Sequence, residues 1–199
     1  HAGLVGEYLI EEMARIPVEV EYASEFRYRN PIITPDDVVI AISQSGETAD
    51  TLAAIKLAKS KGAFVFGVCN VVGSSISQMV NDCIFQGSGP EICVVSTKAA
   101  VSQMVILWRI ALETGVLNGT LTTEKAENIR SNLNLLPDII EKLINEESGF
   151  IRQLAQETNQ VKNWLFMGRG VYYPIAMESA LKMKEVTYIH AEGLPAGFL

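Results

Sequence analysis

Two short apolar runs on either side of an amphipathic stretch constrain the fold of this chain more than any other feature. The runs VVIAIS at Val38–Ser43 and FVFGVC at Phe64–Cys69 are typical of strands buried on both faces of a parallel sheet. The stretch between them, Asp50–Gly62, alternates apolar residues with lysines at helical spacing. This order predicts a βαβ unit, in which ligands bind at the carboxyl ends of the strands.

The same alternation extends to both sides of this unit. We expect a helix at Leu4–Arg15, a strand at Val18–Tyr22, a short strand at Cys83–Phe85 and a long apolar helix from Ser96 to about Leu117. Alternating strands and helices predict an α/β fold of three layers, with a parallel sheet between layers of helices.

The second half of the chain is helical before an α/β pattern returns. The pattern predicts a helix over Thr122–Glu147 with Pro137 as a kink or break, then a further helix at Phe150–Glu157. A strand and glycine turn at Trp164–Gly170 precede an amphipathic helix at Pro174–Gly193. We therefore expect a first α/β domain at 1–120, a helical connector at 121–162, and the truncated start of a second α/β unit at 163–199.

The loop SQSGET after the first buried run carries the strongest signal of a ligand. Ser43, Ser45 and Thr48 supply hydroxyls beside Gln44, and Gly46 allows an anion to approach the backbone. The loop opens a helix, whose first N–H groups are unpaired and carry partial positive charge. These features predict a site for a small phosphorylated metabolite.

Two observations weigh on that interpretation. Helix starts favour serine and threonine as N-caps in any case, so the hydroxyls have a structural alternative. Glu47 would repel a phosphate unless its carboxylate points away or takes part in the chemistry. The nucleotide patterns GxxxxGK[ST] and GxGxxG are absent, so neither a P-loop nor a dinucleotide site is indicated.

Two later loops fall at the same predicted edge of the sheet. Gly73–Ser75 could form a polar wall of the site or only a capped turn. Ser96, Thr97 and Lys98 open the long apolar helix, so two helix starts could face one ligand.

Composition narrows the partners and the compartment. The net charge of −7 argues against nucleic acid or an anionic membrane as the main partner, because both need a basic face. The three cysteines lack a CxxC pair, so we expect free thiols in a reducing cytoplasm and no metal site. The longest apolar stretch is interrupted by Gln103, Arg109 and Glu113, which argues against a membrane span.

Six segments in order resemble the sugar isomerase (SIS) domains of the glutamine:fructose-6-phosphate amidotransferase family. They are Ala23–Arg29, Ser43–Ala54, Cys69–Ser75, Ser96–Ala99, Met167–Gly170 and Ala180–Gly193. The resemblance implies two tandem SIS units, the second truncated. It also implies an aminotransferase that makes glucosamine 6-phosphate from fructose 6-phosphate and glutamine-derived ammonia, without an organic cofactor.

The resemblance also assigns roles to individual residues. It implies that Ser43, Gln44, Ser45 and Thr48 bind the phosphate, and that Val94 and Ser96 contact the sugar. Glu185 would move a proton between C1 and C2 of the open-chain sugar, with Lys182 beside it. From the residues alone, Lys182 and Glu185 at i, i+3 on a helix could equally be a surface ion pair.

Several family parts are expected outside this chain. His1 without a preceding methionine and the end in GLPAGFL suggest a piece of a longer protein, which alone would be inactive. By resemblance, a CGTS-type loop, a ring-opening histidine, an imine-forming lysine and a glutaminase domain would lie elsewhere, and the parent would form a homodimer. Phe198 replaces the family's usual glutamate.

Two alternative functions stay open at this stage. SIS domains also serve as sugar-phosphate sensors in regulatory proteins, and other SIS enzymes include fructosamine-phosphate deglycases. Glu185 and Lys182 favour an enzyme but do not separate a synthase from a deglycase.

Overall fold

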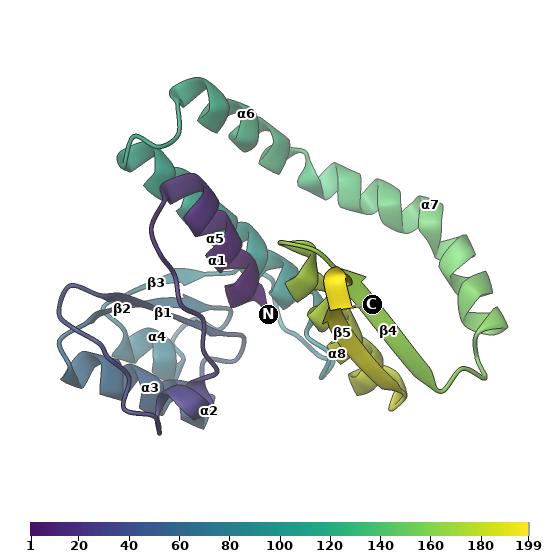
Figure 1. The fold of residues 1–199 in the computed structure, drawn as a ribbon, viewed down its shortest axis with the longest axis horizontal. Coiled ribbons are helices and arrows are strands. Elements are labelled where there is room, and N and C mark those ends of the chain that lie inside the picture. Colours follow the sequence, from purple (N-terminus) through teal and green to yellow (C-terminus); the bar gives the residue numbers. More distant parts are fainter. Residues whose placement is uncertain (199) are drawn as a thin grey trace. The chain divides into compact units, whose positions relative to one another are not determined.

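The computed structural model describes residues 1–198, and contacts within the chain divide it into two units (Figure 1). The inner unit comprises Ala2 and Val18–Leu107. The terminal unit comprises His1, Gly3–Pro17 and the chain from Trp108 onward. Each unit is described by itself.

The inner unit is built on a parallel sheet. Its strands β1 (Val38–Ser43), β2 (Phe64–Cys69) and β3 (Asp82–Phe85) are neighbours in that order. The helices α3 (Ala49–Ser60) and α4 (Ser75–Met79) connect them, and α2 (Ala23–Phe26) packs on α3. The apolar residues that predicted these elements form the core, where the side chains of Ile55, Val65 and Ile76 are fully buried.

The three strands end at one level. Ser43 pairs with Cys69, and Cys69 pairs with Phe85. Because the strands are parallel, the loops that follow them all leave from the same edge of the sheet. The expected α/β βαβ unit is therefore confirmed, and its carboxyl edge lies where the polar loops begin.

The terminal unit contains the second sheet and the long helices. Its strands β4 (Asn163–Gly168) and β5 (His190–Pro195) are parallel and are joined by α8 (Tyr172–Thr187), which packs on both. The expected second α/β unit is thus present. The other elements are α1 (Ala2–Ala14), α5 (Thr97–Leu117, which starts in the inner unit), α6 (Thr123–Asn134), α7 (Leu136–Glu157) and a short 3₁₀ helix (Ala196–Phe198).

The predicted strand at Val18–Tyr22 is wrong. This segment is irregular, and the sheets of residues 1–198 contain only the strands β1 to β5. Its Val–Glu alternation resembles a half-buried strand, but a strand also needs a partner ladder. Glu19 and Glu21 instead pair with Arg29.

Two helix predictions in the second half also need correction. Glu147 does not end a helix, because α7 runs without interruption to Glu157. The break predicted at Pro137 is present: α6 ends at Asn134, α7 begins at Leu136, and Pro137 lies in the first turn of α7, where proline is tolerated. The helix predicted to reach Gly193 ends at Thr187, followed by Tyr188 in the left-handed conformation at φ 58°. The strand β5 was missed because HAEGLP is rich in residues that are depleted in strands.

The helix α5 has the length and apolar composition to cross a membrane, alone among helices of residues 1–198. These two properties do not distinguish a membrane span from the core helix of a globular protein. The expected absence of a span therefore stays a prediction, as does the division into domains at 120 and 162.

Candidate functional site

The hydroxyl-rich loop is folded by its own hydrogen bonds. The Oγ of Ser43, which is 7% exposed, accepts a bond of 3.0 Å from the N–H of Gly46. The Oγ of Ser45 accepts one of 3.2 Å from the N–H of Glu47. Ile76 N–H donates to the carbonyl of Gly46 at 2.9 Å and ties the loop to α4. The serines therefore shape the loop between β1 and α3.

Thr48 does not cap the helix that it precedes. It occupies the N-cap position of α3 with extended backbone, but its side chain makes no capping hydrogen bond. The serines bond N–H groups of the loop rather than those of α3. The two serines therefore stabilise the loop and do not cap α3, and the Thr48 hydroxyl lies at an exposed helix start.

Glu47 is held by the neighbouring helix start. Its carboxylate accepts hydrogen bonds from the N–H of Ser75 at 2.8 Å and from the Ser75 hydroxyl at 2.6 Å. These bonds lower the pKa of Glu47 below its ordinary value of 4.5. The carboxylate therefore stays ionised and is bound to Ser75 at the start of α4.

The Glu47–Ser75 contact predicts a pH-dependent stability. Replacing Glu47 with Gln should lower the free energy of unfolding at neutral pH, because the charge-assisted bonds are lost. A lowered pKa stabilises the folded state above about pH 4.5, and that stabilisation is lost as the pH falls through the lowered pKa. Urea unfolding of the two proteins from pH 7 to pH 3 should show their difference shrinking with acid. A difference that grew below pH 4.5 would contradict this assignment.

Sequence reasoning missed two polar residues, Asn70 and Gln86, that donate hydrogen bonds to backbone carbonyls of the SQSGET loop. Asn70, directly after β2, donates its N–H to the carbonyl of Gln44 at 3.3 Å and accepts from the N–H of Ser88 at 3.0 Å. The side-chain amide of Gln86 donates to the carbonyl of Ser43 at 3.4 Å. Their places immediately after strands were the available signal.

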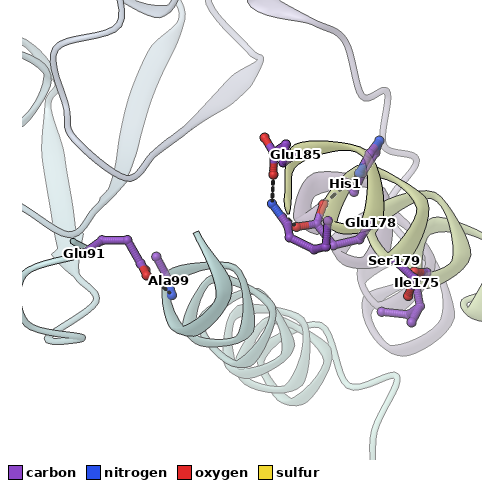
Figure 2. A network of polar contacts seen from close by, with 8 residues as sticks. His1, Glu91, Ala99, Ile175, Glu178, Ser179 and Glu185 are labelled. Carbon is purple, nitrogen blue, oxygen red and sulfur yellow. Dashed lines mark hydrogen bonds and ion pairs between the residues drawn. The ribbon is translucent and has the colours of Figure 1, made fainter. Parts of the chain in front are cut away.

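Val94 and Ser96 flank the start of α5. The Val94 side chain is 87% exposed, and Ser96 has a positive φ of 50° immediately before the helix. Glu91, in the loop before α5, accepts a hydrogen bond of 3.2 Å from the N–H of Ala99 in the first turn of the helix (Figure 2). The N–H group of Ala99, in the first turn of α5, is therefore already bonded to Glu91.

Lys182 and Glu185 lie together on α8 in the terminal unit. The Lys182 Nζ donates to Glu185 Oε2 at 2.9 Å and lies 3.1 Å from Glu178 Oε1 (Figure 2). Their side chains are only 22% and 27% exposed, which is less than expected for a solvated surface pair. The structure thus brings the predicted acid–base residues together and adds Glu178, which the i, i+4 spacing to Lys182 could have indicated.

Burial and hydrogen bonding act in opposite directions on these charges. Burial lowers the pKa of Lys182, but the bonds to Glu185 and Glu178 outweigh it, and the net shift is upward. Lys182 is therefore a fixed cation beside Glu185. Among residues 1–198, no group of three or more His, Cys, Asp or Glu side chains could hold a metal ion.

Solved structures share this fold over nearly the whole chain. The C-terminal domain of glucosamine–fructose-6-phosphate aminotransferase from Francisella tularensis matches with a TM-score of 0.93 and 38% identity, over 100% of this chain and 56% of that one. A candidate phosphosugar isomerase from Clostridium difficile matches with a TM-score of 0.88 over 98% of this chain and 56% of that one, at 21% identity. The second likeness shows the fold alone.

Two bacterial aminotransferases are similar in sequence to nearly the whole chain. Glutamine–fructose-6-phosphate aminotransferase (isomerizing) of Chlorobaculum tepidum is 53% identical over 198 residues, which are 98% of this chain and 32% of that protein. The Clostridium tetani protein of that name is 51% identical over 100% of this chain and 33% of its own length. This chain thus spans about a third of these relatives. The SIS domain model matches residues 1–112, more than half of the sequence, and the chain belongs to the SIS domain family.

Proposed function

We propose that this chain is the isomerase part of an enzyme that makes glucosamine 6-phosphate from fructose 6-phosphate and glutamine-derived ammonia. The observation that carries the proposal is similarity over the whole chain to relatives named for that aminotransferase, at 53% and 51% identity. We expect the chain alone to be inactive as an aminotransferase. The parent enzyme would act in the cytoplasm as a homodimer and would draw ammonia from its own glutaminase domain.

The SQSGET loop would bind the phosphate. Ser43 ends β1, and Gln44, Ser45 and Thr48 lead from it into α3, whose unpaired first N–H groups attract an anion. Because the protein carries a net charge of −7, a phosphate needs such local donors rather than a basic surface. The binding of Glu47 to Ser75 keeps its carboxylate engaged elsewhere.

Glu185 would carry the proton transfer. Converting a ketose to an aldose requires a base that removes a proton beside a carbonyl or imine and returns it one carbon away. A single carboxylate can serve both carbons, and Lys182, kept positively charged, would stabilise negative charge that develops on the sugar oxygens. Val94 and Ser96 would contact the sugar itself.

The half-buried Lys182–Glu185 contact favours an enzyme over a sugar-phosphate sensor. A sensor needs the phosphate loop but has no use for a base and a cation held 2.9 Å apart in a half-buried position. A fructosamine-phosphate deglycase would use the same groups, so the substrate decides between the two enzymes.

Calorimetric titration of the chain tests the binding part of the proposal. We expect heat from fructose 6-phosphate and glucose 6-phosphate but none from unphosphorylated fructose, because the loop recognises the phosphate. Equal binding of fructose and its phosphate would contradict a role for the loop. Turnover of fructose 6-phosphate with glutamine by the full-length enzyme would separate a synthase from a deglycase.

The variant Ser45→Ala should bind fructose 6-phosphate about 10- to 150-fold more weakly. A hydrogen bond to a charged group contributes about 1.5–3 kcal/mol, and the variant cannot make it. Ser60→Ala is the matched control, since Ser60 donates to Leu57 at the other end of α3. A dissociation constant that is the same in both variants would remove Ser45 from the site.

A further inference from the structure

A chain of four polar side chains leads to Glu185 from a residue far away in the sequence. His1 Nδ1 lies 2.8 Å from Glu178 Oε2, and the other Glu178 oxygen lies 3.1 Å from Lys182 Nζ. Lys182 in turn donates to Glu185 at 2.9 Å (Figure 2). The exposed fractions of the side chains rise along this array, from 12% at His1 and 18% at Glu178 to 22% at Lys182 and 27% at Glu185.

Glu178 accepts a hydrogen bond in each of its two contacts. Burial raises the pKa of Glu178, but the bonds from His1 and Lys182 outweigh burial and the net shift is downward, so the carboxylate stays ionised. An ionised carboxylate only accepts hydrogen bonds, so Nδ1 of His1 must donate. Both oxygens of Glu178 are then engaged and its rotamer is fixed from two sides.

The position of Lys182 depends on this arrangement. Its ammonium group lies between two carboxylates, one turn of α8 to either side. Without Glu178, the ammonium would have Glu185 as its one anionic partner among residues 1–198. A tighter pair with Glu185 would restrict the movement of that carboxylate, which proton transfer between two carbons requires.

We propose that His1 and Glu178 are positioning residues for the isomerisation, which hold Lys182 between two carboxylates so that Glu185 stays free to move. The inference rests on the proposed function, because it assumes that Glu185 is the base. His1 acts one step further away, by fixing the Glu178 carboxylate. Neither residue has to contact the sugar.

The test compares variants in the full-length enzyme that contains this chain. Deuterium incorporation into fructose 6-phosphate from D₂O reports proton transfer directly. Glu178→Gln should lower kcat for this exchange about tenfold, because Lys182 would then pair with Glu185 alone and hold it in place, with KM within about twofold of the parent. His1→Leu should lower kcat in the same way, whereas His1→Asn, whose amide nitrogen can replace Nδ1 as donor, should restore it.

Controls separate this proposal from a structural effect and from the proposed function. Glu146→Gln makes the same chemical change in an exposed pair, where Lys142 lies 3.8 Å away, and should leave kcat unchanged. Equal kcat loss in His1→Leu and His1→Asn, or loss confined to KM, would overturn the positioning role. Unchanged kcat in Glu178→Gln, with Glu185→Gln inactive, would overturn it and leave the proposed function intact. Full exchange by Glu185→Gln would overturn both.

Discussion

Replacing Glu185 with Gln in the full-length enzyme should reduce isomerisation of fructose 6-phosphate by about 10²- to 10⁴-fold, the usual contribution of a positioned general base. The amide has nearly the shape of the carboxylate but cannot accept the proton. Lys182 keeps its contact with Glu178, so the cation stays in place. The rate of deuterium exchange into the sugar from D₂O measures the affected step, independently of ammonia supply.

The same variant should still bind the sugar phosphate. The SQSGET loop belongs to the inner unit and Glu185 to the terminal unit, and the loop is folded by its own bonds within the inner unit. Titration with fructose 6-phosphate should therefore give a dissociation constant within about twofold of the parent, since Glu185 is not assigned to the phosphate. Unchanged exchange would exclude Glu185 as the base, and lost binding would show a structural defect instead.

The inner sheet could be predicted from the sequence because its signals are local. The runs at Val38–Ser43 and Phe64–Cys69 are apolar and bounded by turn residues, and each forms the predicted strand. Apolar, β-branched runs of this length are typical of parallel strands, and the loops that follow such strands leave from the carboxyl edge. The hydroxyl loop was found for the same reason.

Elements that depend on a distant partner were not predictable in this way. Val18–Tyr22 has the alternation of a strand but joins no sheet, whereas His190–Pro195 lacks strand propensity and pairs along its whole length with β4. In both cases the decisive term is the presence of a neighbouring ladder. Intrinsic preference had little weight.

The polar partners of the candidate site illustrate the same limit. Sequence spacing placed Lys182 beside Glu185, because residues at i, i+3 share a face of a helix. No spacing rule relates His1 to Glu178, which lie 177 residues apart. The engagement of Glu47 by Ser75 likewise follows from the packing of α4 beside the loop.

Replacing Gly46 with Ala should have the largest effect on the fold of the candidate phosphate loop. Gly46 has a φ of +71°, and a Cβ there would lie 2.1 Å from the Oγ and 2.4 Å from the Cβ of Ser74. Ser74 is 3% exposed and has little room to move. The left-handed backbone and the overlap together should cost about 2–5 kcal/mol of unfolding free energy. Native-state hydrogen exchange in peptides from β1, α3 and α4 would measure the loss within the inner unit.

Gly119 provides a control that separates the two causes. Its φ is also +71°, but a Cβ there would meet nothing within 4 Å, so Gly119→Ala should show only the backbone cost of about 1–2 kcal/mol. Adding Ser74→Gly to Gly46→Ala removes both overlapping atoms and should recover at least about 1 kcal/mol relative to additive effects. Equal losses of unfolding free energy in Gly46→Ala and Gly119→Ala would mean that the Ser74 side chain can move aside without cost. Recovery in the double variant would instead show that the loop requires glycine because buried Ser74, the residue before α4, lies against its backbone.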